Sequence, residues 1–575
     1  MQLIRRFRLP AIFCAVAVLA CAIISRPHAA MGICDDGPYI SVAHTLASTG
    51  RLVYNGWPAA MLGWQLYVGA AFIKLFGFSY TTVRMSTVLV AMVLAFVLQR
   101  TLVHAEITER NATLGTLAFV LSPLYLMLSA TFMSDTFGLF AVVICLYGCV
   151  RALRSSGDNF AIAWLCFAVT TNVICGTARQ IAWLGTLVMV PSALWLFRAR
   201  RRVLLAGCAV ASIGALLIFG CMQWFARQPY IQPERLIPKT FPVLHVLGQL
   251  SSLLLDAPFL LVPIVALFIP EIRRSGPRIV AALSLLFFAY WFLASYPSHI
   301  RGAFPLEPII GWQAGWVGVH GIFEGISLLG KPPLFLSRSI QVPATILSFA
   351  GLAGITVSIR MRPRAERTPP YATRLRRQHL GVLLIPFAIA YIALLVPRAT
   401  DWLFDRYLLP LLAIALLALL RHYQDNVSPK VPLYSLLLIA IMGVIGVAMT
   451  HNTFSLYRAR VALAAELRAN GVPDTSVDNG WEYDLNVELR YAPTVNFPTI
   501  VVPPHAYKHV TPPPPGICQM YYYDYTPHIH AIYGVSFQPD VCYGPAPFAP
   551  VHYSRWLAAS PGTLYVVRYT PPLNR

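Results

Sequence analysis

Long apolar segments alternate with short polar loops along the first 450 residues of the chain. An apolar stretch of about 20 residues crosses the hydrocarbon core of a bilayer as one α-helix. The pattern therefore predicts a polytopic α-helical membrane protein. It indicates about thirteen spans, near residues 10–27, 84–103, 112–131, 137–151, 160–178, 181–197, 203–222, 250–269, 279–296, 340–358, 380–397, 407–420 and 432–449.

The first apolar segment has two interpretations. Arg5, Arg6 and Arg8 precede it, which is typical of a span whose start stays in the cytoplasm. The small residues of "PHAA" (27–30) also suit a cleaved signal peptide. We favour a retained span, because the chain continues with many further spans. Both interpretations place the segment that follows outside the cytoplasm.

Basic residues are concentrated in loops between the apolar segments, as in "RARRR" (198–202) and the strongly basic stretch 359–378. Loops of this kind stay on the cytoplasmic side of a membrane. The formal net charge of +21 is thereby explained without a nucleic-acid partner. An odd number of spans then leaves the N-terminus inside and the C-terminus outside a cell (plasma) membrane, with membrane lipids around the spans.

Two regions are expected on the outer side. The loop 28–83 contains "GWQLYVGAAFIKLFGF" (63–78), which is short and predicts an amphipathic helix lying at the interface. After residue 450 the apolar runs shorten and Pro and Tyr become frequent. A helix over 457–471 ends there at a Gly suited to the C′ position, and short β-like runs follow. We therefore predict a membrane domain over 1–450 and a small extracytoplasmic α+β domain over 451–575.

Most of the eleven cysteines lie in or beside predicted spans, where Cys behaves as a small apolar residue. Cys518 and Cys542 instead lie in the outer region, where an oxidising compartment favours a disulfide between them. Cys34 is left over beside two acids. No Cys and His spacing indicates a zinc site. The acids on the outer side are compatible with a divalent metal, but no pattern indicates one, and no cofactor is expected.

Acidic residues gather at the predicted outer ends of the spans. Asp35 and Asp36 follow the first span, and Asp135 lies in a short turn between the third and fourth spans. Asp401 and Asp405 precede the twelfth span. The topology thus places all five carboxylates on one side of the membrane.

Three arginines, Arg84, Arg179 and Arg406, also fall at outer ends, against the usual preference for the cytoplasmic side. Cations there can hold a phosphate group through charged hydrogen bonds. A neighbouring carboxylate can remove a proton from an incoming hydroxyl. Together these groups predict a site for an anionic substrate carried on a lipid.

Each residue also has a structural interpretation. Asp36 and Asp135 can be N-caps of the helices that follow them. Arg84 and Arg179 can extend their side chains to the lipid headgroups. Taken singly, these structural roles are better supported than chemical ones, and only the convergence of the residues favours a site.

Other polar groups on the outer side carry less information. Asp405 and Arg406 are adjacent and can neutralise each other. His44, His299 and His320 are expected to be interfacial or structural rather than metal ligands.

The order of elements resembles a known family. An acidic pair (Asp35 and Asp36) precedes the phrase "HTLASTGRLVYNGWP", and a helix ending in "LFG" precedes an arginine, Arg84, in "AAFIKLFGFSYTTVRMSTVLVAMVLAF". A second acid, Asp135, follows in "LAFVLSPLYLMLSATFMSDTFGLFAVVICLYGCVRALR". A basic residue, Arg179, stands in "GTARQIAWL". This order resembles membrane glycosyltransferases of the GT-C fold, in the branch of the protein O-mannosyltransferases and the aminoarabinose transferase of lipid A.

The resemblance is good over roughly 30–200 and thinner afterwards, where "DRYLLPLL" (405–412) matches a common later motif. The chain after 450 has no family-specific match. Some relatives carry an acid and a lysine before the proline that starts the interfacial helix, whereas Gly56 and Trp57 precede Pro58 here. The aminoarabinose specificity of those relatives is therefore not transferred to this chain.

For the donor, the resemblance implies a polyprenyl-phosphate sugar that enters from the outer leaflet. Its phosphate is expected against Arg179, with Arg84, Arg406 and Tyr407 as further substrate-binding residues. No nucleotide is needed outside the cell, and no Gly-rich phosphate loop is present.

For the acceptor, the resemblance implies that Asp35 is the general base and that the reaction inverts the anomeric centre. Asp36 and Asp135 are the other expected catalytic residues, which orient the acceptor or raise the basicity of Asp35 by like-charge proximity. The acceptor itself stays open between a glycan, a lipid and a protein.

Two other functions are compatible with the sequence. A transporter or flippase of lipid-linked sugars usually places its ionisable groups near mid-membrane and often has repeated halves. Here the charges are expected at the rim and no halves match, so transport is the second choice. A non-catalytic homologue that binds glycans through the outer domain is the third.

Overall fold

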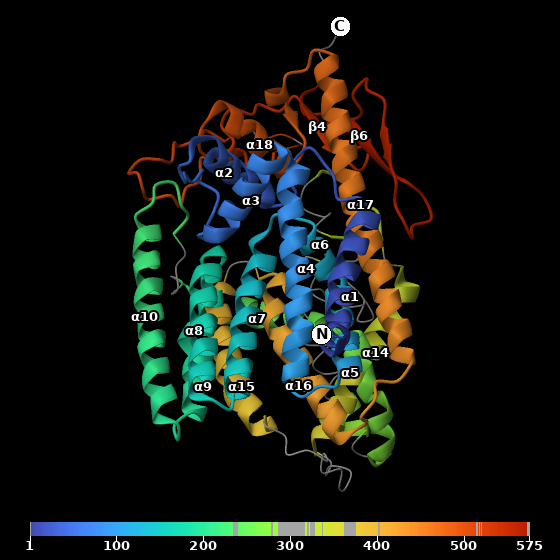
Figure 1. The fold of residues 1–575 in the computed structure, drawn as a ribbon. Coiled ribbons are helices and arrows are strands. Elements are labelled where there is room, and N and C mark those ends of the chain that lie inside the picture. The colour runs from blue at the N-terminus through green and yellow to red at the C-terminus, as the bar shows by residue number, and fades with distance from the viewer. Residues whose placement is uncertain are drawn as a thin grey trace.

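The computed structural model describes residues 2–233, 238, 240–277, 280–285, 317–318, 321–322, 328–335, 337–360, 375–400, 403–512, 516, 518 and 520–571. Figure 1 shows a bundle of helices with a layer of short helices and strands at one end. The outer-side candidates Asp401, His299 and His320 lie outside the described residues.

Among the described residues, nine helices are long and apolar enough to cross a membrane. They confirm a multi-pass α-helical membrane protein. Their bounds are α1 (Gln2–Ser25), α4 (Tyr80–His104), α7 (Ser134–Leu153), α8 (Asp158–Cys175), α10 (Arg201–Ala226), α14 (Arg338–Arg360), α15 (Arg377–Arg398), α16 (Leu409–Asn426) and α17 (Tyr434–Ala469).

The predicted span near 112–131 is not straight. It consists of α5 (Glu109–Val120) and α6 (Pro123–Ser129), which meet at an angle of 71°. Pro123 has no N–H to continue the helix, and the Ser122 hydroxyl accepts a hydrogen bond from the Tyr125 N–H as an N-cap. Gly446 of α17 packs on this bend, where a Cβ would come within 3.1 Å of the Leu121 carbonyl oxygen.

Two more predicted spans differ from a single helix. The segment near 181–197 comprises η2 (Gln180–Trp183), η3 (Gly185–Met189) and α9 (Val190–Leu196). The segment near 250–269 breaks after α11 (Val243–Leu260) into α12 (Val262–Val265) and η4 (Ala266–Arg274). Pro263 stands at the start of α12, where it has no N–H to continue the helix α11. The segment near 279–296 lies mostly outside the described residues.

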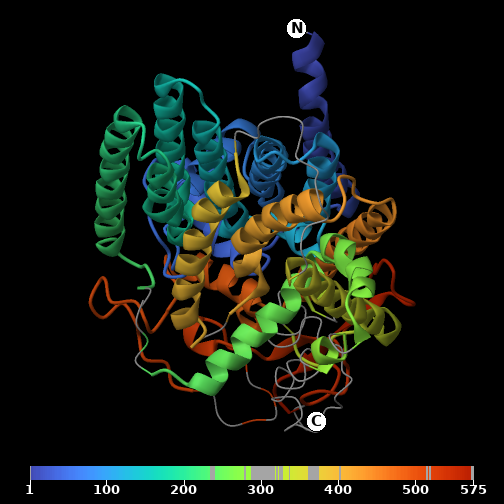
Figure 2. The same ribbon diagram turned by 90° about the horizontal axis from the view of Figure 1, so that it is seen from below.

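Helix α10 illustrates the surface that faces lipid. Figures 1 and 2 place it at the edge of the bundle, beside α8. Its exposed side chains include Leu205, Leu216 and Phe219. An apolar exposed face of this kind is expected of a helix surrounded by hydrocarbon.

The loop 28–83 contains two helices at the end of the bundle, α2 (Asp36–Thr49) and α3 (Gly63–Phe76). The sequence predicted α3 but not α2. Helix α3 forms as expected, but it is apolar on both faces rather than amphipathic. Its buried residues include Leu66, Ala70 and Ile73. Its other face exposes Leu75 and Phe76, which suits contact with the membrane interface.

Helix α17 runs without a break through residue 450, so the predicted helix over 457–471 is the end of the last span. The helix stops where predicted: Gly471 has a φ of +79°, which glycine adopts without steric cost. The change in composition at 450 therefore lies within a continuous helix.

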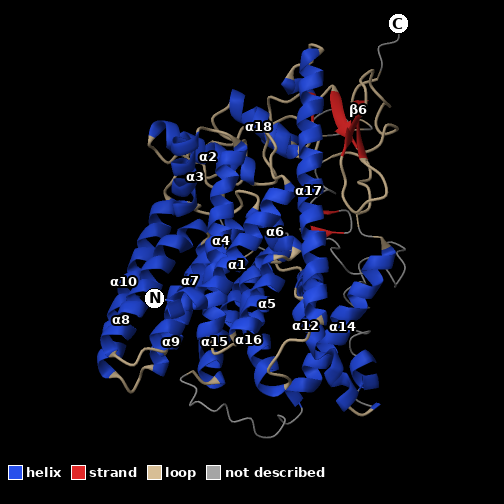
Figure 3. Cartoon of the chain, turned by 45° about the vertical axis from the view of Figure 1, so that its right-hand side comes forward, coloured by secondary structure: helices blue, strands red, loops and turns tan. Residues whose placement is uncertain are grey.

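The layer at the end of the bundle is called the outer layer, or C-terminal layer, after the side expected from the sequence. It contains α18 (Trp481–Tyr491) and a small sheet beside the upper part of α17 (Figure 3). The sheet has the order β3 (Val477–Asp478), β4 (Tyr533–Ser536), β6 (Gly562–Arg568), β5 (Val551–Tyr553). The β3–β4 pair is parallel and the other pairs are antiparallel. A second sheet has two strands, β1 (Val317–Gly318) and β2 (Gly321–Ile322). A disulfide joins Cys518 and Cys542, the pair predicted from the sequence.

The outer layer is hydrogen-bonded to the loop 28–83. The Tyr80 hydroxyl bonds the Asn486 amide oxygen at 2.6 Å, and the Val495 N–H donates to the Asn55 carbonyl at 2.7 Å. Gly56 allows this approach, because a Cβ there would lie 2.7 Å from the Val495 carbonyl oxygen. The C-terminal layer thus covers the region of the acidic pair.

Candidate active site

The two adjacent acids take different environments. Cys34 has a φ of +53°, an uncommon conformation for a residue with a side chain, and it turns the chain directly before Asp35. Asp36 then points into the protein with a fully buried side chain, whereas the Asp35 side chain is 18% exposed. Burial, together with the Asp35 charge, raises the pKa of the Cys34 thiol, so Cys34 stays protonated and unreactive.

Asp36 forms a bidentate ion pair with Arg84. The Arg84 Nε and Nη2 donate to the two carboxylate oxygens at 2.8 and 3.0 Å. The same guanidinium donates to the carbonyls of Ala29 and Met31 at 3.0 and 2.7 Å. Both side chains are at most 1% exposed. This closed arrangement favours a positioning role for Asp36 and Arg84 over direct contact with a substrate.

Asp36 also connects the segment of the acidic pair to the turn that leads to Asp135. Its carboxylate accepts the Ile33 N–H at 2.7 Å and the Phe132 N–H at 3.2 Å. The Gln65 amide donates to the Phe132 carbonyl at 2.8 Å. The short turn that leads to Asp135 is therefore held against loop 28–83.

Asp35 faces a more open environment. One carboxylate oxygen accepts a hydrogen bond from the Trp57 indole N–H at 3.0 Å. The other lies 3.3 Å from Nη2 of Arg406, which comes from a helix 371 positions later in the chain. Asp35 therefore has specific partners but keeps access to solvent.

Arg406 connects Asp35 to the second acid. Its Nη1 lies 3.6 Å from a carboxylate oxygen of Asp135, and Arg179 forms an ion pair with the other oxygen. The four groups are two carboxylates and two guanidiniums, so their formal charges cancel. Burial opposes the charge on Arg179, but Asp135 raises the pKa of that guanidinium above its ordinary value and keeps it protonated.

Tyr407 lies between the two cations. The Arg179 guanidinium is 4.6 Å from its ring centroid, and that of Arg406 is 5.4 Å away. Such contacts orient a cation by its attraction to the ring face. The Arg179 side chain is 21% exposed against 8% for Arg406, so Arg179 is the more accessible cation.

Two residues of the site carried no clear signal in the sequence. Gly138 makes room for Arg179, since a Cβ there would lie 3.0 Å from the Arg179 Cβ. Tyr391 donates a hydrogen bond to the Tyr407 carbonyl at 2.8 Å and lines a small cavity with Asp135, Arg179 and Arg406. A lone tyrosine within the apolar stretch 380–397 was the only hint, and tyrosines are too frequent in spans for it to be specific.

The structure does not support the structural roles considered for Asp36, Asp135 and Arg84. Asp135 is not an N-cap, because Met133 takes that position in α7, and Asp36 bonds an arginine and two N–H groups outside the first turn of α2. Arg84 does not reach a headgroup, because it is buried in its pair with Asp36. Arg406 has distant carboxylate partners, so local neutralisation by its neighbour is not its whole role.

Groups outside this site fit structural roles. His44 stacks on Phe78 with ring centroids 4.0 Å apart. No group of three or more His, Cys, Asp or Glu side chains able to hold a metal ion occurs in the described part of the chain.

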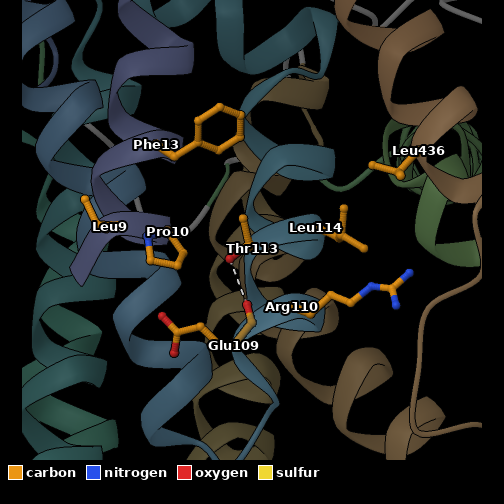
Figure 4. A pocket seen from close by; sticks show the side chains of 8 residues that line it. All are labelled: Leu9, Pro10, Phe13, Glu109, Arg110, Thr113, Leu114 and Leu436. Carbon is orange, nitrogen blue, oxygen red and sulfur yellow. Dashed lines mark hydrogen bonds between the residues drawn. The ribbon is translucent and has the colours of Figure 1, made fainter. Parts of the chain in front are cut away.

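A wider crevice lies near the starts of α1 and α5, and Figure 4 shows its lining. Leu9, Pro10, Phe13 and Leu114 form much of its wall, and Glu109 and Arg110 stand at one side. The Thr113 hydroxyl bonds the Glu109 carbonyl, so this polar group is satisfied within α5. The crevice is a mainly apolar surface between helices and has no convergent ionisable groups like those around Arg406.

The sequence matches no family model, and the search of curated proteins finds no match. Among solved structures, the chain is similar to ArnT from Cupriavidus metallidurans in the apo state, with 14% identity and a TM-score of 0.39 over 82% of this chain and 83% of that one. ArnT bound to undecaprenyl phosphate also matches, with 13% identity and a TM-score of 0.37 over the same shares.

A third match is the archaeal oligosaccharyltransferase AglB from Archaeoglobus fulgidus in complex with an inhibitory peptide and a dolichol-phosphate. Its identity is 13% and its TM-score 0.41, over 90% of this chain and 63% of that one. With TM-scores below 0.5 and such low identities, these likenesses do not by themselves establish a fold or an activity.

Proposed function

We propose that the chain is a membrane glycosyltransferase of the GT-C type. It transfers a sugar from a polyprenyl-phosphate donor to an acceptor hydroxyl at the outer face of the cell membrane. One observation carries the proposal: Asp35 and Asp135 share the Arg406 guanidinium beside a partly exposed Arg179. The order of the sequence motifs supports the same class.

Arg179 is the principal phosphate ligand in this proposal. It is the more exposed cation of the site, and it pairs with Asp135 at a small cavity. A phosphate at this position competes with the carboxylates for the two guanidiniums, since phosphate oxygens accept charged hydrogen bonds in the same geometry. Arg406 and the Tyr407 ring complete the donor side.

Donor binding has a consequence for Asp35. When Arg406 turns its charge toward the phosphate, the Asp35 carboxylate loses a favourable partner and becomes a better base. Asp35 then takes the proton of the acceptor hydroxyl, whose oxygen attacks the anomeric carbon. The bond from that carbon to the phosphate oxygen breaks, and its electron pair leaves with the polyprenyl phosphate. Attack opposite the leaving group inverts the anomeric centre.

The remaining candidates have supporting roles. Asp135 aligns Arg179 and Arg406, and Asp36 with Arg84 holds the segments that carry Asp35 and Asp135 in place. The proposal includes no nucleotide and no resident cofactor. The proposal puts the site, loop 28–83 and the C-terminal layer outside the cytoplasm. The basic loop 198–202, at the opposite end of the bundle (Figure 1), supports this orientation.

Asp35→Asn tests the proposal. Asparagine keeps the shape and one oxygen acceptor, but it cannot take the proton. The transfer rate should fall by a factor of about 10² to 10⁴ while donor binding is retained. Purified protein in nanodiscs, given radiolabelled polyprenyl-phosphate sugars and bacterial envelope fractions as acceptors, provides both measurements.

Asp158→Asn is the matched control, since Asp158 pairs with Arg200 at the other end of the bundle. This variant should transfer sugar at the wild-type rate. Equal rates for Asp35→Asn and the wild type would show that Asp35 is not the base. Movement of the labelled lipid between leaflets without any transfer would favour a flippase instead.

A further inference from the structure

A series of aromatic rings leads from Asp35 to the surface of the outer layer. Trp57, which donates to Asp35, stacks on Trp481 with centroids 5.2 Å apart and planes at 25°. Trp481 in turn contacts the edge of Tyr522 at 6.2 Å. The indole that holds Asp35 is therefore in direct contact with side chains of the C-terminal layer.

A second branch broadens this series. Phe497 packs at 5.8 Å from Trp57 and stacks on Tyr525 at 4.5 Å. Tyr525 stacks on Tyr522 at 5.2 Å, and Tyr521 meets Tyr522 edge-on at 5.2 Å. We call this set the aromatic wall. Its members are Trp57, Trp481, Phe497, Tyr521, Tyr522 and Tyr525.

The wall is anchored at one end and open at the other. Trp481 is only 5% exposed, whereas Tyr522 is 38% and Tyr521 64% exposed. The wall therefore offers ring faces and phenol hydroxyls to solvent next to Asp35. Helix α18, which carries Trp481, lies in the layer at the end of the bundle (Figure 1).

The described segment 520–525, which carries the tyrosines, is bonded to its neighbours. Tyr522 has a φ of +60°, which is a strained conformation for a bulky side chain. The Asn496 amide donates to the carbonyls of Lys508 and Asp524, both at 2.8 Å, and the disulfide of Cys518 fixes the start of the loop. These bonds restrict the backbone beside the exposed rings.

The chemistry of the wall restricts its ligand. Burial and the nearby tyrosines and Asp35 raise the pKa of Tyr522 to about 12, so its hydroxyl remains a hydrogen-bond donor at neutral pH. A pyranose ring has apolar C–H groups that pack on an aromatic face and hydroxyls around its rim that bond phenols.

We propose that the aromatic wall is the acceptor subsite and that the acceptor is a carbohydrate. A pyranose ring stacks on Tyr522, and one of its hydroxyls reaches Asp35. This inference rests on the proposed function for the role of Asp35, but binding by the wall can be measured without any transfer.

Saturation-transfer NMR on the full chain in nanodiscs tests the wall. The probes are a mixture of gluco-, manno- and galacto-configured tetrasaccharides and, separately, the peptide Ala-Ala-Ser-Ala-Ala. Ring C–H protons of at least one tetrasaccharide should receive saturation from the wild type. Tyr522→Ala should weaken this binding about three- to tenfold, as expected for one lost stacking contact. Tyr522→Phe, which keeps the ring, should lose less.

Tyr491→Ala is the matched control, because Tyr491 is an exposed tyrosine of the same layer that stacks on His528 instead. It should bind like the wild type. No saturation of any tetrasaccharide, an equal signal with Tyr522→Ala, or Tyr522-dependent binding of the peptide alone would overturn the inference. Donor transfer measured on the same samples separates the two proposals: wall binding without any transfer would refute the proposed function and the acceptor role of the wall, and would leave a carbohydrate-binding site.

Discussion

Two ion-pair groups near the outer end of the bundle use the same residue types in opposite ways. In the Asp36–Arg84 pair, each carboxylate oxygen and each guanidinium nitrogen has a close partner, and neither side chain reaches solvent. In the Asp35–Arg406–Asp135–Arg179 group, one guanidinium is shared at 3.3 and 3.6 Å, and Asp35 and Arg179 are partly exposed. Full satisfaction makes the first group rigid. The partial exposure of Asp35 and Arg179 leaves the second group able to exchange partners with a substrate.

The largest expected effect concerns stability at the closed pair. Asp36→Asn leaves Arg84 charged, buried and without its counter-ion. Such a change typically costs about 3–5 kcal/mol of folding free energy. The unfolding temperature of the variant in detergent should fall sharply, together with its expression level. A variant with wild-type unfolding but no transfer would instead assign Asp36 a direct chemical role.

The next effect concerns donor affinity at the Asp35–Arg406–Asp135–Arg179 group. Arg179→Ala removes a charged hydrogen bond worth about 1.5–3 kcal/mol, so polyprenyl phosphate should bind roughly 10- to 100-fold more weakly. Unfolding should change less than for Asp36→Asn, because the buried Asp135 keeps Arg406 as a partner. Native mass spectrometry with titrated polyprenyl phosphate measures the affinity. Arg179→Lys should recover part of it, and unchanged affinity for Arg179→Ala would remove Arg179 from the donor site.

The smallest expected effect is on stability and concerns a third group of charged residues, the carboxyl pair of Asp478 and Asp484 in the outer layer. Burial, and then the neighbouring Asp478, raises the pKa of Asp484 well above its ordinary value. Folding therefore favours the protonated acid: the stabilising contribution is complete below the unfolded pKa of about 3.9 and is lost as the pH rises through the folded pKa.

Asp484→Asn replaces that proton by a permanent amide donor. Relative to the wild type, the variant should gain about 1 kcal/mol of stability at pH 8, and the gain should shrink as the pH falls toward 4. Unfolding temperatures at both pH values measure it. A gain that is independent of pH would show that Asp484 is not protonated on folding.

The residues differ in how far the sequence could predict them. Asp35, Asp135, Arg179 and Arg406 were expected on one side of the membrane, and the structure brings them together. Arg84 was expected near a phosphate but is paired with Asp36, since nothing in the order of residues says which arginine an acid will meet. Trp57 looked like the loss of a polar contact, yet its indole holds Asp35.

The sequence by itself determined the membrane class, most of the span positions and the gathering of the charges at one end of the bundle. These properties follow from the length of apolar segments and the distribution of basic loops, which are local and cumulative along the chain. Only the tertiary structure decided that adjacent Asp35 and Asp36 differ, that Arg406 is shared across 371 positions, and that tyrosines of the outer layer lie beside Asp35. Those outcomes depend on backbone turns such as the one at Cys34 and on contacts between distant segments, which no local pattern of residues encodes.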